Sequence, residues 1–405
     1  MEITGFTLEC LTGTLDVDPD EFYAERLARP IDVYPEFRRE TATDMFVGGG
    51  SEETNTAATE DGLEISQVFL RVETDTEVTG VVGPVAEKWV PHIAGFEDLL
   101  VGEDPRATEH CWDLMYRSAI HGRKGQTVQA ISAIDVALWD AKGKALDEPV
   151  YRLLGGPCRT DLPVYASMLG YPVDPASVRE HAAEMQSRSI EAQKWFFRYG
   201  VGSGSEGKQA NEALVRAARE AVGEEYDLYF DAWSSWNRSF ALEMFDRIAP
   251  YGPDWVEEPV RADRIEGYVE LREEAPFPIA GGEHEYTRYG AHELLSRGAV
   301  DVLQLDTMWG GGITEMQHVC SLASVHDVPV VPHGHLVHAN AHVIAAHPEP
   351  LCPLVEYLDR WNEKDQFFFA NEVKPEDGTV SPPDVPGVGV AIDKSQVEER
   401  ETVGG

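Results

Sequence analysis

The chain has 405 residues, of which 42% are hydrophobic and 26% are charged, and these values exclude a wholly disordered protein. Aspartate and glutamate total 72 against 33 lysines and arginines, so the net charge is −39. Such an acidic chain repels nucleic acid and anionic membranes, and no apolar run approaches the roughly 20 residues of a membrane helix.

The acidic residues are spread along the whole chain rather than gathered in a tail. At molar salt the Debye length falls to about 3 Å, which screens the repulsion within such a surface. We therefore predict a halophilic protein, with an ordinary acidic protein as the alternative. The N-terminus lacks the pattern of a secretory signal, so we expect a cytoplasmic location. The five cysteines contain no Cys-x-x-Cys pair, which predicts buried, inert thiols rather than disulfides or a zinc site.

The first hundred residues are predicted to be mixed and rich in strands, with strands near residues 65–73 and 77–82. An irregular stretch, residues 16–62, precedes them and includes Gly-Gly-Gly-Ser at 48–51, which is typical of a functional or disordered loop. Residues 104–145 are predicted to be helical, because apolar residues recur at helical spacing.

From about residue 160, short apolar strands alternate with segments of helical length. Eight such units predict a parallel sheet that closes into an α/β barrel. The expected strands are 162–167, 192–197, 227–232, 255–258, 279–283, 302–306, 328–333 and 354–358. The last 40 residues are predicted to be loops that return to the first domain.

Ionisable residues end six consecutive predicted strands at intervals of 23 to 27 residues, close to one strand–helix unit each. Because the C-terminal ends of barrel strands meet at one rim, these side chains are expected to converge where such barrels carry their active sites. The six are Asp231, Glu257, Glu283, Asp306, His333 and Glu356.

The first three are carboxylates on neighbouring strands, which lie about 4.8 Å apart. Three carboxylates so close cannot all stay ionised without a cation. A set of oxygen ligands favours a hard ion, so Asp231, Glu257 and Glu283 predict a Mg²⁺ site. The alternative is three solvated acids at strand ends.

The next two residues predict a general base. A carboxylate beside a histidine orients the imidazole and raises its pKa, as expected for Asp306 beside His333. Glu356, on the last strand, is expected to bond substrate or a developing oxyanion, unless it is an ordinary strand-end carboxylate.

Three stretches of the chain resemble the enolase superfamily, specifically its mandelate racemase/muconate lactonizing branch. They are Ser-Ala-Ile-Asp-Val-Ala-Leu-Trp-Asp at 132–140, Leu-Leu-Gly-Gly at 153–156 and Trp-Val-Glu-Glu-Pro at 255–259. The resemblance implies a modified (β/α)7β TIM-like barrel at 160–365. It also implies an α+β capping domain at 1–155 that residues 366–405 complete, Mg²⁺ on the three carboxylates, and a homo-oligomer.

Within that branch the chain is most similar to the L-rhamnonate dehydratases, which carry Gly-Glu-His at the third ligand, as at 282–284 here. The resemblance implies a catalytic Asp306–His333 dyad with Glu356, and it places His284 beside the substrate. In the N-terminal capping loop we nominate Tyr34, Arg38 and Arg39 as substrate-binding residues, with exposed surface residues as the alternative.

Racemases and cycloisomerases of the branch resemble one another in a Lys-x-Lys at the end of the second strand, whose second lysine is a base opposite the histidine. Here Lys194 matches the first lysine, but Phe196 occupies the second position. Lys194 is expected to hold a carboxylate oxygen. Arg198 could act electrostatically but not as a base, because guanidinium keeps its proton.

These residues predict a Mg²⁺-dependent acid-sugar dehydratase, with L-rhamnonate, L-lyxonate and L-mannonate as candidate substrates. His333 would remove the C2 proton while Mg²⁺ stabilises the enediolate, and loss of the C3 hydroxyl would yield a 2-keto-3-deoxy sugar acid. The first alternative, a racemase or epimerase of a hydroxy acid, needs a second base that Phe196 does not supply. The second is a non-catalytic sugar-acid-binding barrel.

Overall fold

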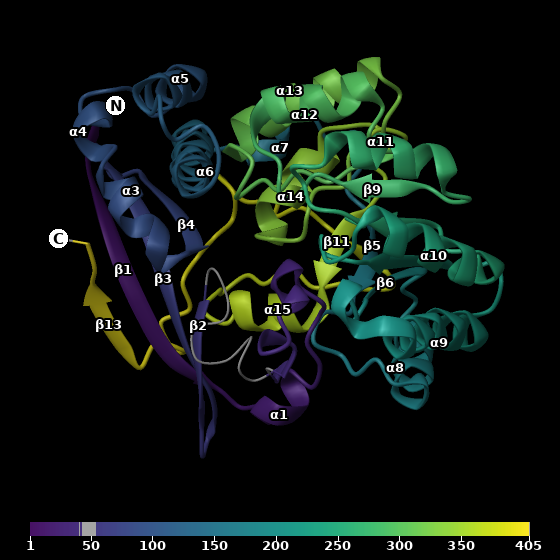
Figure 1. The fold of residues 1–405 in the computed structure, drawn as a ribbon. Coiled ribbons are helices and arrows are strands. Elements are labelled where there is room, and N and C mark those ends of the chain that lie inside the picture. The colour runs from purple at the N-terminus through teal and green to yellow at the C-terminus, as the bar shows by residue number, and fades with distance from the viewer. Residues whose placement is uncertain (40, 43–53, 405) are drawn as a thin grey trace.

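The computed structural model describes residues 1–39, 41–42 and 54–404, in which helices pack around two sheets (Figure 1). An antiparallel sheet lies near the termini, and a parallel sheet forms the larger part of the molecule. This arrangement confirms the predicted fold class, a TIM-like barrel with an α+β capping domain. The domain boundaries at 155, 160 and 365 stay predictions.

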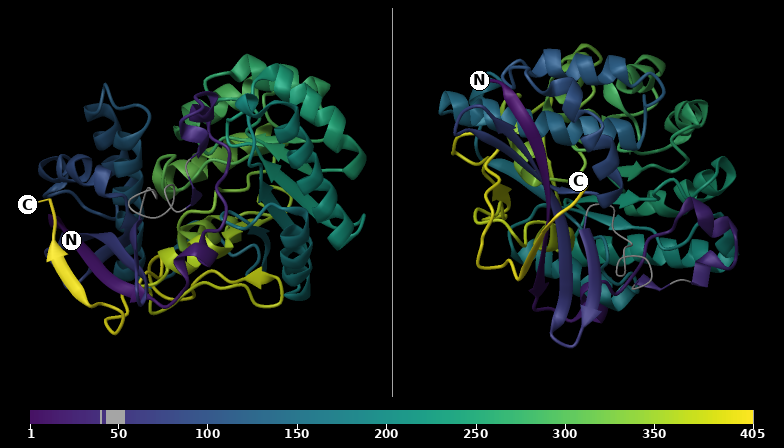
Figure 2. Two further views of the ribbon diagram at one scale, coloured as in Figure 1. Left: turned by 60° about the horizontal axis from the view of Figure 1, so that its bottom comes forward. Right: turned by 90° about the vertical axis from the view of Figure 1, so that its left-hand side faces the viewer.

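The antiparallel sheet has the strand order β13-β1-β3-β2, with β4 also paired to β3. Its strands are β1 (Ile3–Leu15), β2 (Thr54–Thr59), β3 (Gly62–Thr74), β4 (Thr79–Val85) and β13 (Glu399–Thr402). The strands expected near 65–73 and 77–82 are β3 and β4. The last strand, β13, pairs with β1, so the chain returns from the barrel to the sheet in which it began (Figure 2).

Two segments differ from the expected elements. The helical region predicted at 104–145 is two helices, α5 (Thr108–Ser118) and α6 (Gln126–Leu146), because Gly125 adopts a positive φ of 74° before the second. The irregular stretch predicted at 16–62 contains β2, the short α1 (Pro19–Phe22), and 3₁₀ turns η1 (Pro30–Val33) and η2 (Phe37–Arg39). The glycine-rich residues 48–51 lie outside the described residues.

The parallel sheet has the order β10-β9-β8-β7-β6-β5-β11. Its strands are β5 (Leu162–Ser167), β6 (Ala192–Phe196), β7 (Asp227–Asp231), β8 (Trp255–Glu257), β9 (Ile279–Gly281), β10 (Val302–Leu303) and β11 (Val355–Leu358), and β12 (Thr379–Val380) pairs antiparallel with β5. The helices between and after the strands are α8 (Pro175–Ser187), α9 (Gly204–Val222), α10 (Arg238–Ile248), α11 (Ile265–Glu274), α12 (Thr287–Arg297), α13 (Gly312–Val325), α14 (Val337–Ala345) and α15 (Asp359–Asp365). Smaller elements are α3 (Val90–Ala94), α4 (Glu97–Leu100), α7 (Val150–Leu153), η3 (Glu87–Trp89), η4 (Val201–Ser203) and η5 (Ala249–Tyr251).

Several strands are shorter than predicted at the end that carries the ionisable residues. Glu283 and Asp306 follow the last residues of β9 and β10, and the strand expected at 328–333 is reduced to single bridges, Leu303 with Val330 and Asp306 with His333. At these strand ends the chain turns and leaves the hydrogen-bonded sheet. Gly282, at a φ of 127°, makes that turn directly before Glu283 in a conformation that a side chain would disfavour.

The barrel interior beneath this rim is filled by large apolar side chains. Tyr229 and Trp255 stack with ring centroids 3.4 Å apart, and Val331 belongs to the same buried cluster. Each lies two residues before an ionisable residue, and strand residues two apart face the same side. The ionisable side chains therefore form the layer above this buried cluster.

The motif at 132–140 docks the capping helix onto the barrel. On α6, the Asp135 carboxylate accepts hydrogen bonds from the backbone N–H and the hydroxyl of Thr314, at 2.9 and 2.6 Å. Ser132 accepts one from the Gly311 N–H at 2.8 Å, and both partners belong to the start of α13 or the residue before it. Burial raises the pKa of Asp135 to about 7. These contacts make this stretch an interface between the domains rather than part of the chemistry.

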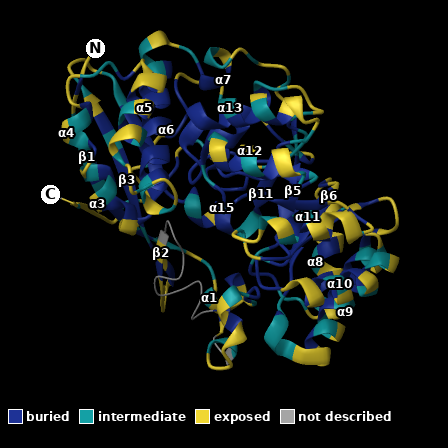
Figure 3. Ribbon diagram, turned by 45° about the horizontal axis from the view of Figure 1, so that its top comes forward, coloured by how far each residue is buried: buried dark blue, intermediate teal, exposed yellow. Residues whose placement is uncertain are grey.

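The outer faces of the barrel helices are exposed while their inner faces are buried (Figure 3), so the outer surface carries much of the acidic excess. No helix of the described residues has the length and apolar character required to cross a membrane. The prediction that all five cysteines are buried is wrong for two of them, since Cys158 is exposed and Cys10 is half-buried.

The net charge of −39 predicts that salt stabilises this fold. The melting temperature is expected to rise by at least about 5 °C as KCl increases from about 0.1 M to above 1 M, because screening shortens the range of the repulsion. Thermal unfolding followed by circular dichroism measures this, with an uncharged osmolyte at equal osmolality as the control. A melting temperature that is flat or falling in KCl refutes halophilic adaptation.

Candidate metal centre and general base

Three carboxylates from adjacent strands meet at the rim. Asp231 ends β7, Glu257 ends β8 and Glu283 follows β9, and one oxygen of each lies within 4.8 Å of the others. All three are buried, with exposed fractions of 2% or less. Burial of three acids at this spacing is costly unless a cation or protons compensate their charge.

The carboxylate cluster (Asp231, Glu257 and Glu283) fits a divalent cation on its own chemistry. Asp231 Oδ2 and Glu283 Oε2 are buried and accept no hydrogen bond from the described residues. Burial raises the pKa of Asp231 well above its usual range, and the charge of Glu257 raises it further. Burial likewise raises the pKa of Glu257 to about 7. Burial opposes ionisation of Glu283 too, but the positive charges of His333 and His284 outweigh it and lower that pKa to about 2.

The turns after two of these strands are held in an unusual backbone conformation. Trp233, Ser234 and Glu258 adopt positive φ values of 41°, 59° and 42°. Such conformations cost of order 1–3 kcal/mol each and persist where surrounding structure enforces them, often at functional sites. Here they turn the chain sharply at the rim, and the Trp233 N–H donates to Asp231 Oδ1 at 2.7 Å.

Lys194 is completely buried between two carboxylates. Its Nζ donates to both oxygens of Glu257 at 2.8 and 2.9 Å and lies 2.8 Å from Glu356 Oε1. Burial opposes its charge, but Glu257 and Glu356 more than compensate and raise the pKa of Lys194 well above its usual range. Lys194 is therefore a fixed cation. Phe196, two residues later, packs with its ring centroid 5.4 Å from the same Nζ.

Glu356 lies between Lys194 and the segment that carries His333. Its Oε2 accepts a hydrogen bond from the Gly334 N–H at 3.0 Å. Burial opposes its ionisation, but the charges of Lys194 and His333 lower the pKa of Glu356 below its usual value. Glu356 is thus an ionised carboxylate that borders both groups.

Asp306 holds two histidines. Its Oδ2 accepts hydrogen bonds from Nδ1 of His333 and Nδ1 of His335, at 2.7 and 2.8 Å, while Oδ1 accepts from the backbone N–H groups of Met308 and Trp309. Burial opposes the charge of Asp306, but His335 and His333 lower its pKa to about 2. With Nδ1 donating, Nε2 of His333 is directed at the carboxylate cluster, 3.5 Å from Glu283 Oε2.

Sequence reasoning missed several polar partners of this site. Gln304 donates to Glu257 Oε2 at 2.7 Å, Trp233 Nε1 donates to Glu283 Oε1 at 3.1 Å, and His335 shares Asp306. Gln304 lies two residues before Asp306, and His335 two residues after His333. The period of two along an extended chain was the signal that could have found both.

His284 lies at the edge of the cluster, where it bonds Glu258 Oε2 at 2.8 Å and lies 3.5 Å from Glu283 Oε1. Burial opposes its charge, but Glu258 raises the pKa of His284 to about 10. Its side chain is 32% exposed and lines a pocket of about 490 Å³. The pocket is lined by Arg29, Pro30, Ile31, Trp233, Ser234, Arg261, Ala262, Asp263 and His284.

The residues nominated in the capping loop have other contacts. Tyr34 is 57% exposed, Arg38 donates to the Gly202 carbonyl, and Arg198 Nε donates to Glu25 at 2.9 Å. The side chain of Arg39 lies outside the described residues. The segment carrying Tyr34 and Arg38 does reach the rim, because the Ala28 N–H donates to the Phe197 carbonyl at 2.8 Å. Substrate binding by these residues stays a prediction.

Comparison with known proteins places both parts of the chain. Residues 177–396 match a family described as enolase C-terminal domain-like, and residues 53–155 match the mandelate racemase/muconate lactonizing enzyme N-terminal domain. The chain is 34% identical to L-rhamnonate dehydratase of Saccharopolyspora erythraea, over 95% of this chain and 94% of that protein. It is 32% identical to D-galactarolactone cycloisomerase of Agrobacterium fabrum, over 82% and 91%. The crystal structure of rhamnonate dehydratase from Gibberella zeae complexed with Mg has a TM-score of 0.79 and 26% identity, covering 98% of this chain and 95% of that one.

Proposed function

Because this chain belongs to the mandelate racemase/muconate lactonizing enzyme family of the enolase superfamily and is an enzyme, we propose that it dehydrates an acid sugar to a 2-keto-3-deoxy sugar acid. The observation that carries this proposal is that, among the residues that the structure describes, one histidine base has no second base opposite it. His333 faces the carboxylate cluster, whereas Lys194 is held by Glu257 and Glu356, and Phe196 cannot accept a proton.

The carboxylate cluster is the proposed site of Mg²⁺. Asp231 Oδ2 and Glu283 Oε2 accept no hydrogen bond from the described residues, and these oxygens and the oxygen-only chemistry of the cluster suit a hard ion. A relative's structure is described as complexed with Mg. When bound, the ion supplies positive charge against a substrate carboxylate whose negative charge grows as the neighbouring carbon loses its proton. Lys194 adds a fixed positive charge beside the same carboxylates.

His333 is the proposed base and Asp306 its positioning residue. Asp306 accepts a hydrogen bond from the Nδ1–H of His333, so Nε2 keeps the lone pair that removes the proton from C2. Burial opposes the positive charge of His333, but the negative charge of Glu283 is the main cause that raises its pKa. A cation on the carboxylate cluster would offset the negative charge of Glu283. Binding of a cation to the carboxylate cluster would therefore lower the pKa of His333 and favour its neutral, basic form.

The second half of the reaction is the loss of the C3 hydroxyl. The proton that His333 takes from C2 protonates the departing hydroxide, so the substrate loses one water and the resulting enol tautomerises to the 2-keto product. Use of one residue for both transfers requires the C2 proton and the C3 oxygen on the same side, that is, a syn elimination. His284 and the 490 Å³ pocket beside it are the proposed contact for the rest of the sugar.

A screen of acid sugars tests the proposed activity. With Mg²⁺ and molar KCl, we expect 2-keto acid to form from one or a few aldonates of the L-rhamnonate, L-lyxonate and L-mannonate type, measured by semicarbazone absorbance. Lactones belong in the same screen, because one relative is a cycloisomerase. Turnover of a lactone without 2-keto-3-deoxy product contradicts dehydration, and C2 epimerisation without water loss favours the racemase alternative. The cytoplasmic location and homo-oligomeric state stay predictions.

A further inference from the structure

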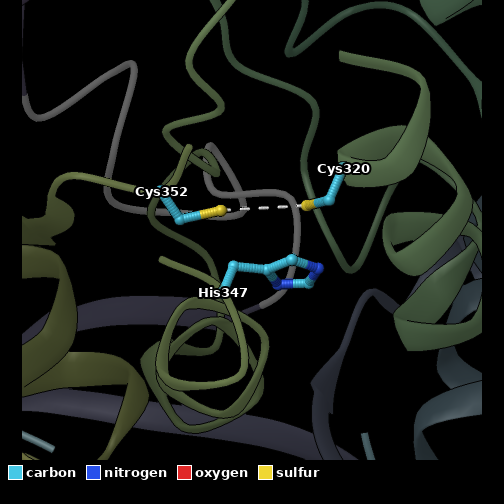
Figure 4. A group of neighbouring side chains, drawn as sticks. All are labelled: Cys320, His347 and Cys352. Carbon is cyan, nitrogen blue, oxygen red and sulfur yellow. Dashed lines mark hydrogen bonds between the residues drawn. The ribbon is translucent and has the colours of Figure 1, made fainter. Parts of the chain in front are cut away.

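A second cluster of metal-binding side chains lies away from the rim. Cys320 on α13 and Cys352 before β11 are fully buried, and their Sγ atoms are 3.8 Å apart. His347, just after α14, lies beside the pair (Figure 4). One donor atom of each residue lies within 4.8 Å of the other two. We call these three residues the thiol–imidazole cluster.

A hydrogen bond to the backbone fixes the ring of His347. Its Nδ1 lies 2.8 Å from the Val343 carbonyl oxygen, and a carbonyl can only accept, so Nδ1 carries the proton. Nε2 is therefore left with its lone pair. Metal-bound histidines almost always donate their other ring N–H to a carbonyl, a carboxylate or water in this way.

The spacing of the sulfurs fits one ion between them. Two sulfurs that are each about 2.3 Å from a tetrahedral zinc lie about 3.8 Å apart, and the two Sγ atoms here have that separation. A disulfide would require an S–S distance of about 2.05 Å and therefore movement of α13 or the chain before β11. Zinc would fit this pair without such movement.

The thiol–imidazole cluster is separate from the carboxylate cluster in place and in chemistry. Cys352 lies four residues before Glu356 along the chain entering β11, which corresponds to about 13 Å in an extended strand, so it faces the opposite end of the barrel. Sulfur and nitrogen donors suit a borderline-soft ion, whereas the oxygen-only rim suits a hard one. His347 is half-buried, which leaves a path for an ion to enter.

We propose that Cys320, His347 and Cys352 bind one Zn²⁺ ion, with water completing a tetrahedral site. No fourth side chain joins the thiol–imidazole cluster within the part of the chain that the structure describes. On binding, each thiol releases one proton to solvent and the zinc keeps its oxidation state. The ion would tie α13, the end of α14 and the start of β11 together. The same strand–helix units carry Asp306, His333 and Glu356 at the rim of the barrel. We therefore propose a structural role for the zinc, which would hold these units in place.

Cobalt provides a readout that the carboxylate cluster cannot give. Full-length protein is stripped with EDTA, supplied with excess Mg²⁺ and titrated with Co²⁺, and we expect one equivalent to produce a thiolate-to-cobalt charge-transfer band in the near ultraviolet. Zn²⁺ should abolish the band by displacement. Cys320→Ser and Cys352→Ser should lose it, and His347→Asn should bind Co²⁺ about 10–100-fold more weakly. Cys111→Ser, at another fully buried cysteine on α5, is the matched control and should keep the band.

Stability gives the second measurement. Zn²⁺ at large excess over its Kd is expected to raise the melting temperature of the wild-type protein by about 5 °C and to leave Cys320→Ser unchanged. Absence of the charge-transfer band together with an unchanged wild-type melting temperature overturns the proposal and leaves a hydrogen-bonded thiol pair. Freshly purified protein with a Cys320–Cys352 disulfide and no zinc, determined by mass spectrometry and elemental analysis, also overturns it.

Discussion

Removal of divalent cations with EDTA is expected to abolish turnover, and Mg²⁺ is expected to restore it. Without a cation, the buried carboxylates of Asp231, Glu257 and Glu283 repel one another, and Asp231 and Glu257 keep their protons to higher pH, as their raised pKa values indicate. Asp231→Asn or Glu283→Gln should lower kcat/KM by about 10³-fold or more, which corresponds to roughly 4 kcal/mol of transition-state stabilisation. Mg²⁺ affinity measured by calorimetry should fall in parallel.

Asp227→Asn is the matched control for Asp231→Asn. It is the same substitution on the same strand, but Asp227 is an exposed residue at the opposite end of β7. It should keep activity, metal affinity and melting temperature near those of the wild type. Full activity in a folded Asp231→Asn or Glu283→Gln variant contradicts the ligand assignment, and so does EDTA-resistant turnover.

His333→Asn is expected to lose C2 proton exchange and dehydration together. One residue serves both transfers in the proposed mechanism, and general acid–base catalysis is typically worth about 10²–10⁴-fold, so the loss should lie at or beyond the upper end. Exchange is measured by NMR in D₂O, and dehydration by 2-keto acid formation under the same conditions. The proposed syn stereochemistry can be determined from a C3-labelled substrate.

His326→Asn, at an exposed histidine that caps α13, is the control and should change neither rate. Near-native C2 exchange in His333→Asn would identify another residue as the base. His335 would then be tested first, because it bonds the same Asp306 oxygen, and Lys194 second. Loss of dehydration with retained exchange would instead assign His333 to the second step only.

The spacing of the chemical residues was accessible from sequence because it follows from the architecture. An acid or histidine every 23 to 27 residues, each at the end of an apolar strand, can only converge if the strands are parallel and their ends share a rim. The resemblance to the family's Lys-x-Lys motif also indicated from sequence that Phe196 replaces its second lysine, which would face the same way as Lys194. The rim spacing and the replaced lysine narrow the set of reactions that the site could catalyse. Both could be recognised from the sequence without the tertiary structure.

The contacts of the capping segment could not be predicted in this way. Tyr34 and Arg38 lie in a stretch without helical or strand periodicity, so the sequence does not specify which partners they meet. The structure places Arg38 on the Gly202 carbonyl and Arg198 on Glu25, 173 residues away. Identification of the sugar depends on such contacts.

The sequence by itself therefore determined the barrel, the convergence of the rim residues and their chemical types, because period-two and strand–helix patterns are local. Only the tertiary structure decided which of these groups pair. It fixed Lys194 between Glu257 and Glu356, gave Asp306 two histidines, and brought Cys320, His347 and Cys352 together from separate elements. Such pairings join residues up to 162 positions apart, as Lys194 and Glu356 are, and they form only when packing of the strands and helices sets the distance between them.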